Sequence, residues 1–196
     1  MVAFMVRIMQ SKQGLRKQIL TKRRNLDPSE VKNLSRKICE RILQMDIYKE
    51  AKNICCYMPI NKEADVTELF QTAWKQGKAL WLQVTKDGEM EFFLYAEGTS
   101  LRSGNYGIPE PDCQEKLQPD EKTLIIMPGA VFSEEGDRIG YGGGYYDKYL
   151  SKYSCCRTCA AAYGFQVVKE LPAEVHDIRP EFIVTEEKVI CSQAKK

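Results

Sequence analysis

The sequence predicts one α/β domain of three layers, a mainly parallel sheet with helices on both faces. Two observations lead to this fold class. Apolar, strand-like segments alternate with helix-like segments over most of the chain. The 196 residues, 43% hydrophobic and 29% charged, also match the size and composition of a single globular unit. We expect residues 1–10 to be an extension and residues 192–196 a tail.

The first helix is expected over Lys12–Arg24, where Leu15, Ile19 and Leu20 have helical spacing. This segment holds six basic residues and no acid: Lys12, Arg16, Lys17, Lys22, Arg23 and Arg24. One interpretation is a solvated basic face, as most charge runs are. The other is an anion clamp, because Lys12 and Arg16 are four residues apart and share a helix face.

Two further helices are predicted from their capping signals. The segment Asp27 to Glu30 has the residues of a capping box with proline in the first turn, and an apolar stripe follows to about Met45. The segment Asp65 to Glu68 is a second cap before an amphipathic helix through Gln76, which Gly77 closes. A last helix is expected from about residue 145 to 153.

Strands are predicted where short apolar runs are bounded by turn residues. They are residues 53–58, 78–84, 90–96, 123–127, 158–163, 182–185 and 188–191. The turn at 86–88 makes the second and third a hairpin. Residues 101–118 and 128–144, rich in glycine and proline, are expected to be connections.

The eight cysteines are expected to be reduced thiols of a cytoplasmic protein. Only one pair, Cys156 and Cys159, has C-x-x-C spacing, whereas a zinc site of this kind needs a second pair. No apolar run reaches about 18 residues, and we expect neither a membrane span nor a secretion signal. The formal net charge of +2 neither demands nor excludes a nucleic-acid partner.

The most informative segment is 127–147, which leaves a strand, carries six glycines and enters a helix. Glycines let backbone N–H groups approach an anion, and the following helix adds partial positive charge. Arg138 offers a fork of donors for phosphate. Asp147 either suits the helix dipole or holds Mg²⁺ beside phosphates. The alternative is a flexible glycine loop, since the spacing matches neither a P-loop nor a dinucleotide fingerprint.

The ordered residues of this segment resemble the 5-formyltetrahydrofolate cyclo-ligase family. They are Met127-Pro-Gly, Phe132, Gly136, Arg138-Ile-Gly and Gly143-Gly-Tyr-Tyr-Asp147. Three more matches follow the family's order: Lys12-Gln-Gly-Leu-Arg16, Tyr57-Met-Pro-Ile-Asn-Lys-Glu63 and His176-Asp177. The resemblance therefore spans the chain from Lys12 to about Glu186.

The resemblance implies an enzyme that uses ATP and Mg²⁺ to convert 5-formyltetrahydrofolate into 5,10-methenyltetrahydrofolate, ADP and phosphate. The formyl oxygen would attack the γ-phosphorus, and N10 would then displace the phosphate as the ring closes. Such chemistry needs positioning and charge neutralisation rather than a protein nucleophile. The partners would be a reduced folate and ATP, with no nucleic acid or membrane, and the protein would be a monomer.

The resemblance also implies the site residues. Catalytic roles would fall to Lys12, Arg16, Arg138 and Asp147, and metal binding to Asp147 and Asp177. The residues expected to bind ATP are Lys12, Gln13, Gly14, Leu15, Arg16, Arg138, Ile139, Gly140, Tyr141, Gly142, Gly143, Gly144, Tyr145 and Tyr146. The residues expected to bind the folate are Met58, Glu63, Tyr106, Tyr141, Gly142, Gly143, Gly144 and Tyr145.

Each weaker assignment has a structural alternative. Glu63 can be a surface acid before a helix cap, Asp177 a turn residue and Tyr106 a loop-packing aromatic. At the level of fold, the chain resembles the wider superfamily of sugar-phosphate isomerases and coenzyme A transferases, which implies a competing enzyme class without ATP. A second alternative is a non-enzymatic nucleotide or RNA binder that uses the basic first helix. Its affinity for nucleic acid would depend steeply on salt concentration.

Overall fold

A computed structural model of the chain describes residues 11–172 and 178–192. The largest element is a seven-stranded sheet in the order β12-β11-β9-β6-β1-β2-β3. Its strands are β1 (Asn53–Cys56), β2 (Ala79–Lys86), β3 (Glu89–Leu94), β6 (Thr123–Met127), β9 (Arg157–Ala161), β11 (Phe182–Val184) and β12 (Val189–Cys191). The five inner strands run parallel, and an antiparallel strand closes each edge. This confirms the mostly parallel sheet predicted from the sequence.

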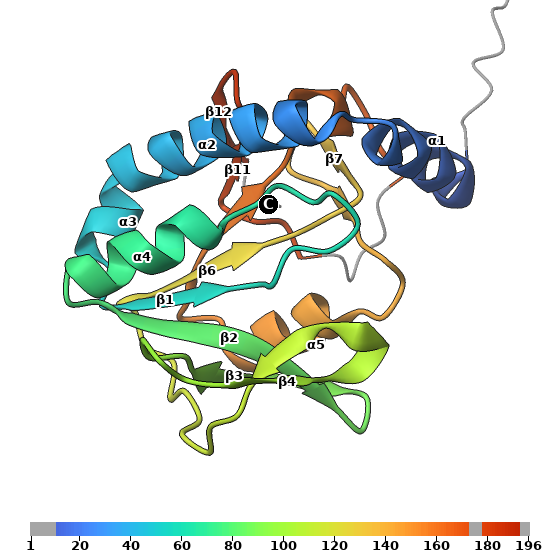
Figure 1. The fold of residues 1–196 in the computed structure, drawn as a ribbon. Coiled ribbons are helices and arrows are strands. Elements are labelled where there is room, and N and C mark those ends of the chain that lie inside the picture. The colour runs from blue at the N-terminus through green and yellow to red at the C-terminus, as the bar shows by residue number, and fades with distance from the viewer. Residues whose placement is uncertain (1–10, 173–177, 193–196) are drawn as a thin grey trace, which may run out of the picture.

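Helices cover both faces of this sheet (Figure 1). On one face lie α2 (Pro28–Gln44), α3 (Asp46–Glu50) and α4 (Thr67–Lys75). On the other lies α5 (Tyr145–Lys152). The side chains of each strand alternate between the two cores: Ile54 and Cys56 of β1 face the first, and Cys55 faces the second.

Two smaller sheets complete the fold. The short strands β7 (Val131–Ser133), β8 (Arg138–Ile139) and β10 (Val167–Val168) form one, and β4 (Leu101–Ser103) and β5 (Pro109–Pro111) form the other. Two single-turn 3₁₀ helices cover Asn105–Gly107 and Gly164–Gln166. Helix α1 (Lys12–Arg24) packs Ile19 against Ala130, Val131 and Ile139 and lies beside β7 (Figure 1).

Most local signals are confirmed. Asp27 and Glu30 form both halves of the capping box of α2. The carboxylate of Asp65 accepts from the backbone N–H and hydroxyl of Thr67, the first residue of α4. The N-cap position is however Val66, which makes no side-chain capping bond, and α4 ends at Lys75, so the predicted cap and the predicted end are each displaced by one residue. Gly77 follows with φ +69°.

Several predicted boundaries are wrong. The first strand ends at Cys56 rather than residue 58, and helix α3 was not predicted. The two connections contain short strands that were not predicted: β7 pairs locally with β8 and, across a long stretch of sequence, with β10, whereas β4 and β5 pair within one connection. All eight cysteine thiols are free. Within the described residues, no helix has the length and apolar character needed to cross a membrane.

Candidate active site

A cavity of about 750 Å³ opens where strands β1 and β6 end. In open α/β sheets, the crevice beyond the carboxyl ends of the strands is the usual place for ligands. The walls come from α1, from the segments after β1 and β6, from β2 and β3, and from the glycine loop. The described lining residues are Lys12, Arg16, Tyr57, Met58, Ile60, Asn61, Glu63, Gln83, Thr85, Met90, Ile108, Pro128, Arg138, Ile139, Gly140, Tyr141, Gly142, Gly143, Gly144, Tyr145, Tyr146 and Asp147.

The glycine loop forms one wall and needs glycine at specific positions. Gly142 and Gly144 have φ values of +104° and +63°, which L side chains rarely adopt. A methyl group on Gly143 would lie 2.5 Å from the ring of Tyr145. Gly144 then precedes α5, so the loop delivers its backbone to a helix N-terminus that faces the cavity.

The two ends of the loop are joined by an ion pair. Arg138 Nη2 donates to both carboxylate oxygens of Asp147, at 2.9 and 3.0 Å. The backbone N–H of Ile178 donates to the same carboxylate at 3.1 Å. The Arg138 side chain is 6% exposed and that of Asp147 27%, so the pair is largely withdrawn from water.

Helix α1 supplies the cationic side of the cavity. Lys12 and Arg16 both line it, while Lys17 is exposed elsewhere on the helix. A Cβ atom on Gly142 would lie 4.0 Å from Arg16 Nη1, so this guanidinium lies beside the glycine loop. The Nε atoms of Arg16 and Arg138 are both buried and have no hydrogen-bond partner among the described residues. Two unsatisfied cationic donors flanking one loop form an arrangement suited to an anion.

Glu63 lines the cavity from a tight turn after β1. Asn61 and Lys62 both have positive φ, 49° and 58°. This turn brings Glu63 back, so that its Oε2 accepts from the Ile60 N–H at 3.0 Å. Lys62 fastens the turn to the end of α1, since its ammonium donates to the carbonyls of Arg24 and Leu26, both at 2.6 Å.

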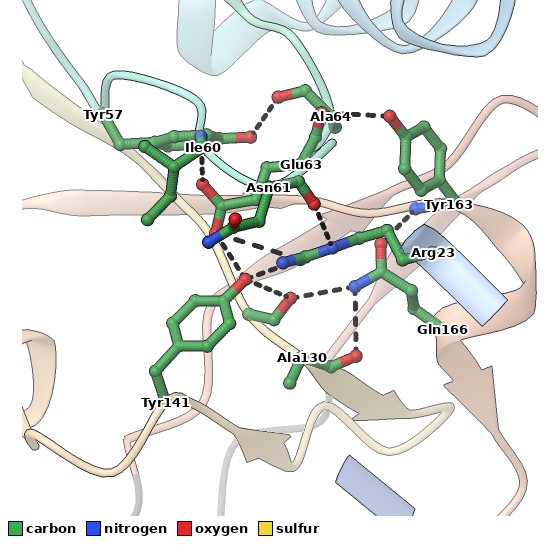
Figure 2. A network of polar contacts seen from close by, with 11 residues as sticks. Arg23, Tyr57, Ile60, Asn61, Glu63, Ala64, Ala130, Tyr141, Tyr163 and Gln166 are labelled. Atoms are coloured by element: carbon green, nitrogen blue, oxygen red, sulfur yellow. Dashed lines mark hydrogen bonds and ion pairs between the residues drawn. The ribbon is translucent and has the colours of Figure 1, made fainter. Parts of the chain in front are cut away.

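The Glu63 carboxylate is buried at 5% exposure in a polar network. Tyr141 donates its hydroxyl proton to Glu63 Oε1, and Arg23 Nη1 lies 3.9 Å from the same oxygen (Figure 2). Burial raises the pKa of Glu63, and these donors lower it only in part. Tyr141 lines the cavity and is 46% exposed as a residue. Burial and the nearby Glu63 raise the pKa of its hydroxyl. The network therefore presents an acceptor to the cavity.

Not every predicted residue lines the cavity. Gln13 and Gly14 are exposed on α1, and Leu15 packs beside the small sheet rather than in the cavity wall. Tyr106 has its backbone in a 3₁₀ helix, but its side chain lies outside what the structure describes, as does all of Asp177.

Several residues of the site were not predicted from the sequence. Gln83 accepts from the buried hydroxyl of Tyr146 at 2.6 Å, and Thr85 and Met90 line the wall beside it. Arg23 was counted only within a basic run, yet it is 2% exposed. A signal for Arg23 was present, because residues 12, 16, 19 and 23 lie on one face of a helix.

The described carboxylates that line the cavity are too few to bind Mg²⁺ by themselves and would need the phosphates of a bound nucleotide as further ligands. Among the described residues, no three His, Cys, Asp or Glu side chains gather to hold a metal ion. Mg²⁺ is usually held by one or two carboxylates plus substrate phosphates. Asp147 in the cavity wall supplies one such carboxylate.

Comparisons with known proteins find relatives that match most of the chain. The sequence profile of the 5-formyltetrahydrofolate cyclo-ligase family matches residues 8–186. A probable 5-formyltetrahydrofolate cyclo-ligase of Schizosaccharomyces pombe is 33% identical over 171 residues, which cover 78% of this chain and 84% of the relative. The 5-formyltetrahydrofolate cyclo-ligase of Escherichia coli K12 is 28% identical over 178 residues, 87% of this chain and 98% of that one.

Solved structures show the same likeness. The structure of Aquifex aeolicus 5,10-methenyltetrahydrofolate synthetase superposes with a TM-score of 0.84 and 34% identity, covering 94% of both chains. A 5,10-methenyltetrahydrofolate synthetase from Mycoplasma pneumoniae has a TM-score of 0.71 at 26% identity, covering 90% of this chain and 99% of that one.

Proposed function

Because the chain belongs to the 5-formyltetrahydrofolate cyclo-ligase family of enzymes, we propose that it converts 5-formyltetrahydrofolate into 5,10-methenyltetrahydrofolate at the expense of ATP. The products would be the methenyl folate, ADP and phosphate. The observation that carries the ATP requirement is the pair of buried, unpartnered Nε donors of Arg16 and Arg138 beside the glycine loop. Unsatisfied cationic donors of this kind call for a phosphate-bearing ligand.

The nucleotide would lie along the glycine loop and the start of α5. Lys12, Arg16 and Arg138 would neutralise its phosphates, and the loop from Ile139 to Tyr146 would enclose it. Backbone N–H groups near the positive-φ glycines can approach the phosphates without a Cβ in the way. In this proposal Gln13, Gly14 and Leu15 belong to the helix that carries the clamp rather than to the cavity surface.

The folate would lie on the side of Glu63. A carboxylate in a buried turn can accept hydrogen bonds from the N–H groups at the edge of the pterin ring. Met58 and the exposed ring of Tyr141 would pack against the ring system, beside Tyr145 and the loop glycines. We assign Tyr106 a place at the same ligand through the family resemblance.

The chemistry that follows is phosphoryl transfer and then ring closure. The formyl oxygen forms a bond to the γ-phosphorus, and the bond from that phosphorus to the bridging oxygen breaks to release ADP. N10 then forms a bond to the former formyl carbon and gives up its proton. The carbon–oxygen bond breaks, and phosphate leaves. The protein's part is to hold the two ligands in line and to stabilise charge on the phosphoryl group.

Mg²⁺ would be held by Asp147, and by Asp177 on the family pattern, together with the nucleotide phosphates. Bound there, it would neutralise charge on those phosphates. Arg138 contacts the same carboxylate and would share that task. We further propose one domain, related to the sugar-phosphate isomerase and coenzyme A transferase superfamily, that works as a monomer in the cytoplasm without nucleic acid or membrane.

The decisive experiment mixes the protein with 5-formyltetrahydrofolate, ATP and Mg²⁺ and follows the absorbance of the methenyl product. Omission of ATP, and separately of Mg²⁺, is expected to stop product formation, and ADP should appear in equal amount to the methenyl folate. Product formed at full rate without ATP would refute the proposal. Turnover of a sugar phosphate or a coenzyme A ester instead would favour the competing superfamily activities.

A further inference from the structure

The guanidinium of Arg23 lies in a buried position between the turn after β1 and the glycine loop (Figure 2). Its Nε donates to the carbonyl of Asn61 at 3.1 Å, and its Nη1 donates to the hydroxyl oxygen of Tyr141 at 2.6 Å. The same group lies over the Tyr141 ring, 5.5 Å from the ring centroid. One side chain of α1 thus contacts both of the segments that border the Glu63 side of the cavity.

These contacts fix the direction of the next hydrogen bond. An arginine has donors and no acceptor, so the oxygen of Tyr141 must accept from it. The phenol has one proton, and Glu63 Oε1 is its nearby acceptor, whereas the carbonyl of Gly129 lies 3.4 Å away. The chain therefore runs from Arg23 to Tyr141 to Glu63, with the carboxylate as the terminal acceptor.

From this geometry we propose that Arg23 is a positioning residue: through the Tyr141 hydroxyl it keeps Glu63 an oriented, ionised acceptor for the N–H groups of the folate. The inference rests on the proposed function, since it names how that function's folate site is held. Arg23 touches neither the cavity surface nor the reacting atoms, and it acts only through Tyr141 and Glu63.

The electrostatic surroundings of Glu63 explain why a cation is needed there. Burial raises the pKa of Glu63, while Tyr141, the Ile60 N–H and Arg23 oppose that rise. The other titratable groups that face it are the phenols of Tyr57 and Tyr146, whose own pKa values burial and Glu63 raise, so both stay neutral. Arg23 is thus the positive charge among the described groups that act on this carboxylate.

A simple docking role for Arg23 makes a different prediction. Arg23 belongs to the helix that carries Lys12 and Arg16, so a loosened helix would weaken ATP binding. The end of that helix is also held by a separate set of contacts: the Lys62 ammonium donates hydrogen bonds to the carbonyls of Arg24 and Leu26. Lys62→Met removes these contacts but keeps the side chains of Arg23, Tyr141 and Glu63, and it serves as the docking control.

The experiment compares Arg23→Met, Arg23→Lys and Tyr141→Phe with the exposed neighbour Arg24→Met as matched control. KM for 5-formyltetrahydrofolate and for ATP is measured from pH 6 to 9, with calorimetric binding of 5-formyltetrahydrofolate in the absence of ATP. Arg23→Met and Tyr141→Phe should raise the folate KM and dissociation constant about tenfold or more, as expected for loss of a hydrogen bond to a charged group, and change the ATP KM less than about threefold. Arg23→Met should bind folate tightly only at a higher pH than the wild type does. Arg23→Lys should keep the wild-type pH profile. Arg24→Met should leave the KM for folate and the KM for ATP unchanged.

Two results would overturn the inference. One is an Arg23→Met protein that binds folate like the wild type. The other is a loss shared equally by both substrates, with an unshifted pH profile and the same pattern in Lys62→Met. If Arg23→Met does not fold, Tyr141→Phe decides by the same split between the folate KM and the ATP KM. A wild-type protein that forms no methenyl product would refute the proposed function instead, and the calorimetric arm then tests the folate site by itself.

Discussion

Arg138 Nη2 donates to both carboxylate oxygens of Asp147, nine positions further along the chain at the other end of the glycine loop. The pair closes the loop at its base and holds the guanidinium so that its buried Nε is left without a partner. A guanidinium that is already held by a carboxylate needs little further ordering to bind a phosphate, which lowers the entropic cost of binding. The ion pair therefore prepares the loop for the nucleotide.

Replacement of Asp147 tests this role. Asp147→Ala should lower kcat/KM for ATP by about a hundredfold and destabilise the fold by about 1–3 kcal/mol, because it leaves the Arg138 guanidinium without its acceptor. Activity is to be measured over a Mg²⁺ titration and stability by urea unfolding. The control is Glu134→Ala, which removes one partner of an exposed ion pair with Lys188 and should change either quantity little. Wild-type activity of Asp147→Ala at limiting Mg²⁺ would contradict the assignment.

The raised pKa of Glu63 predicts how stability depends on pH. Between the pKa of the unfolded chain and the higher pKa of the fold, the folded state binds more protons. The contribution of Glu63 to stability is therefore present at low pH and is lost as pH rises through that window, with a slope of at most about 1.4 kcal/mol per pH unit. Glu63→Gln cannot titrate and should lack this slope.

The measurement is the free energy of unfolding of wild type and Glu63→Gln from pH 4 to 8. The difference, wild type minus variant, should fall as pH rises above about 4.5. A difference that rises with pH would mean that the folded pKa is depressed, and that the donors around Glu63 outweigh its burial.

Those parts of the site that depend on residues close together in sequence could be predicted from the sequence. Helical spacing places Lys12 and Arg16 on one face, and the structure has both at the cavity. The glycine run after a strand and before a helix predicts the loop, which depends on φ values that only glycine adopts easily. The mostly parallel sheet followed from the alternation of strands and helices in the same way.

The remainder depends on contacts between distant segments. The turn of Asn61 and Lys62 has two positive φ values without a glycine, and Lys62 is held there by carbonyls 36 and 38 residues away. Arg23 meets Tyr141 across 118 residues, so the run of basic residues alone does not show which one is buried. The strands β7, β8 and β10 escaped prediction because two or three residues carry too little pattern.

The conformation of Gly144 gives a prediction with a matched control. Gly144 and Gly88 have φ values of +63° and +79°, and a methyl group on either would meet no atom within 4 Å. Gly144→Ala and Gly88→Ala should each destabilise the fold by about 1–2 kcal/mol from backbone strain alone. Only Gly144→Ala should also raise KM for ATP, because it alters the entry into α5. If the two variants have the same KM for ATP, the conformation of Gly144 does not contribute to nucleotide binding.

The last prediction concerns Arg16 and Lys17, neighbours in sequence on different faces of α1. Successive residues of a helix are about 100° apart, so only one of the two can face the cavity. Arg16 does so with a buried, unpartnered Nε, whereas Lys17 is exposed. Arg16→Ala should therefore raise KM for ATP, or lower kcat if the contact tightens in the transition state, by about tenfold to a hundredfold, equivalent to roughly 1.5–3 kcal/mol. Lys17→Ala should change kcat/KM little, since an exposed charge contributes about 0–1 kcal/mol. Steady-state ATP kinetics of both variants at two salt concentrations decide between a clamp and a general basic surface, because a general surface would lose activity equally with either change.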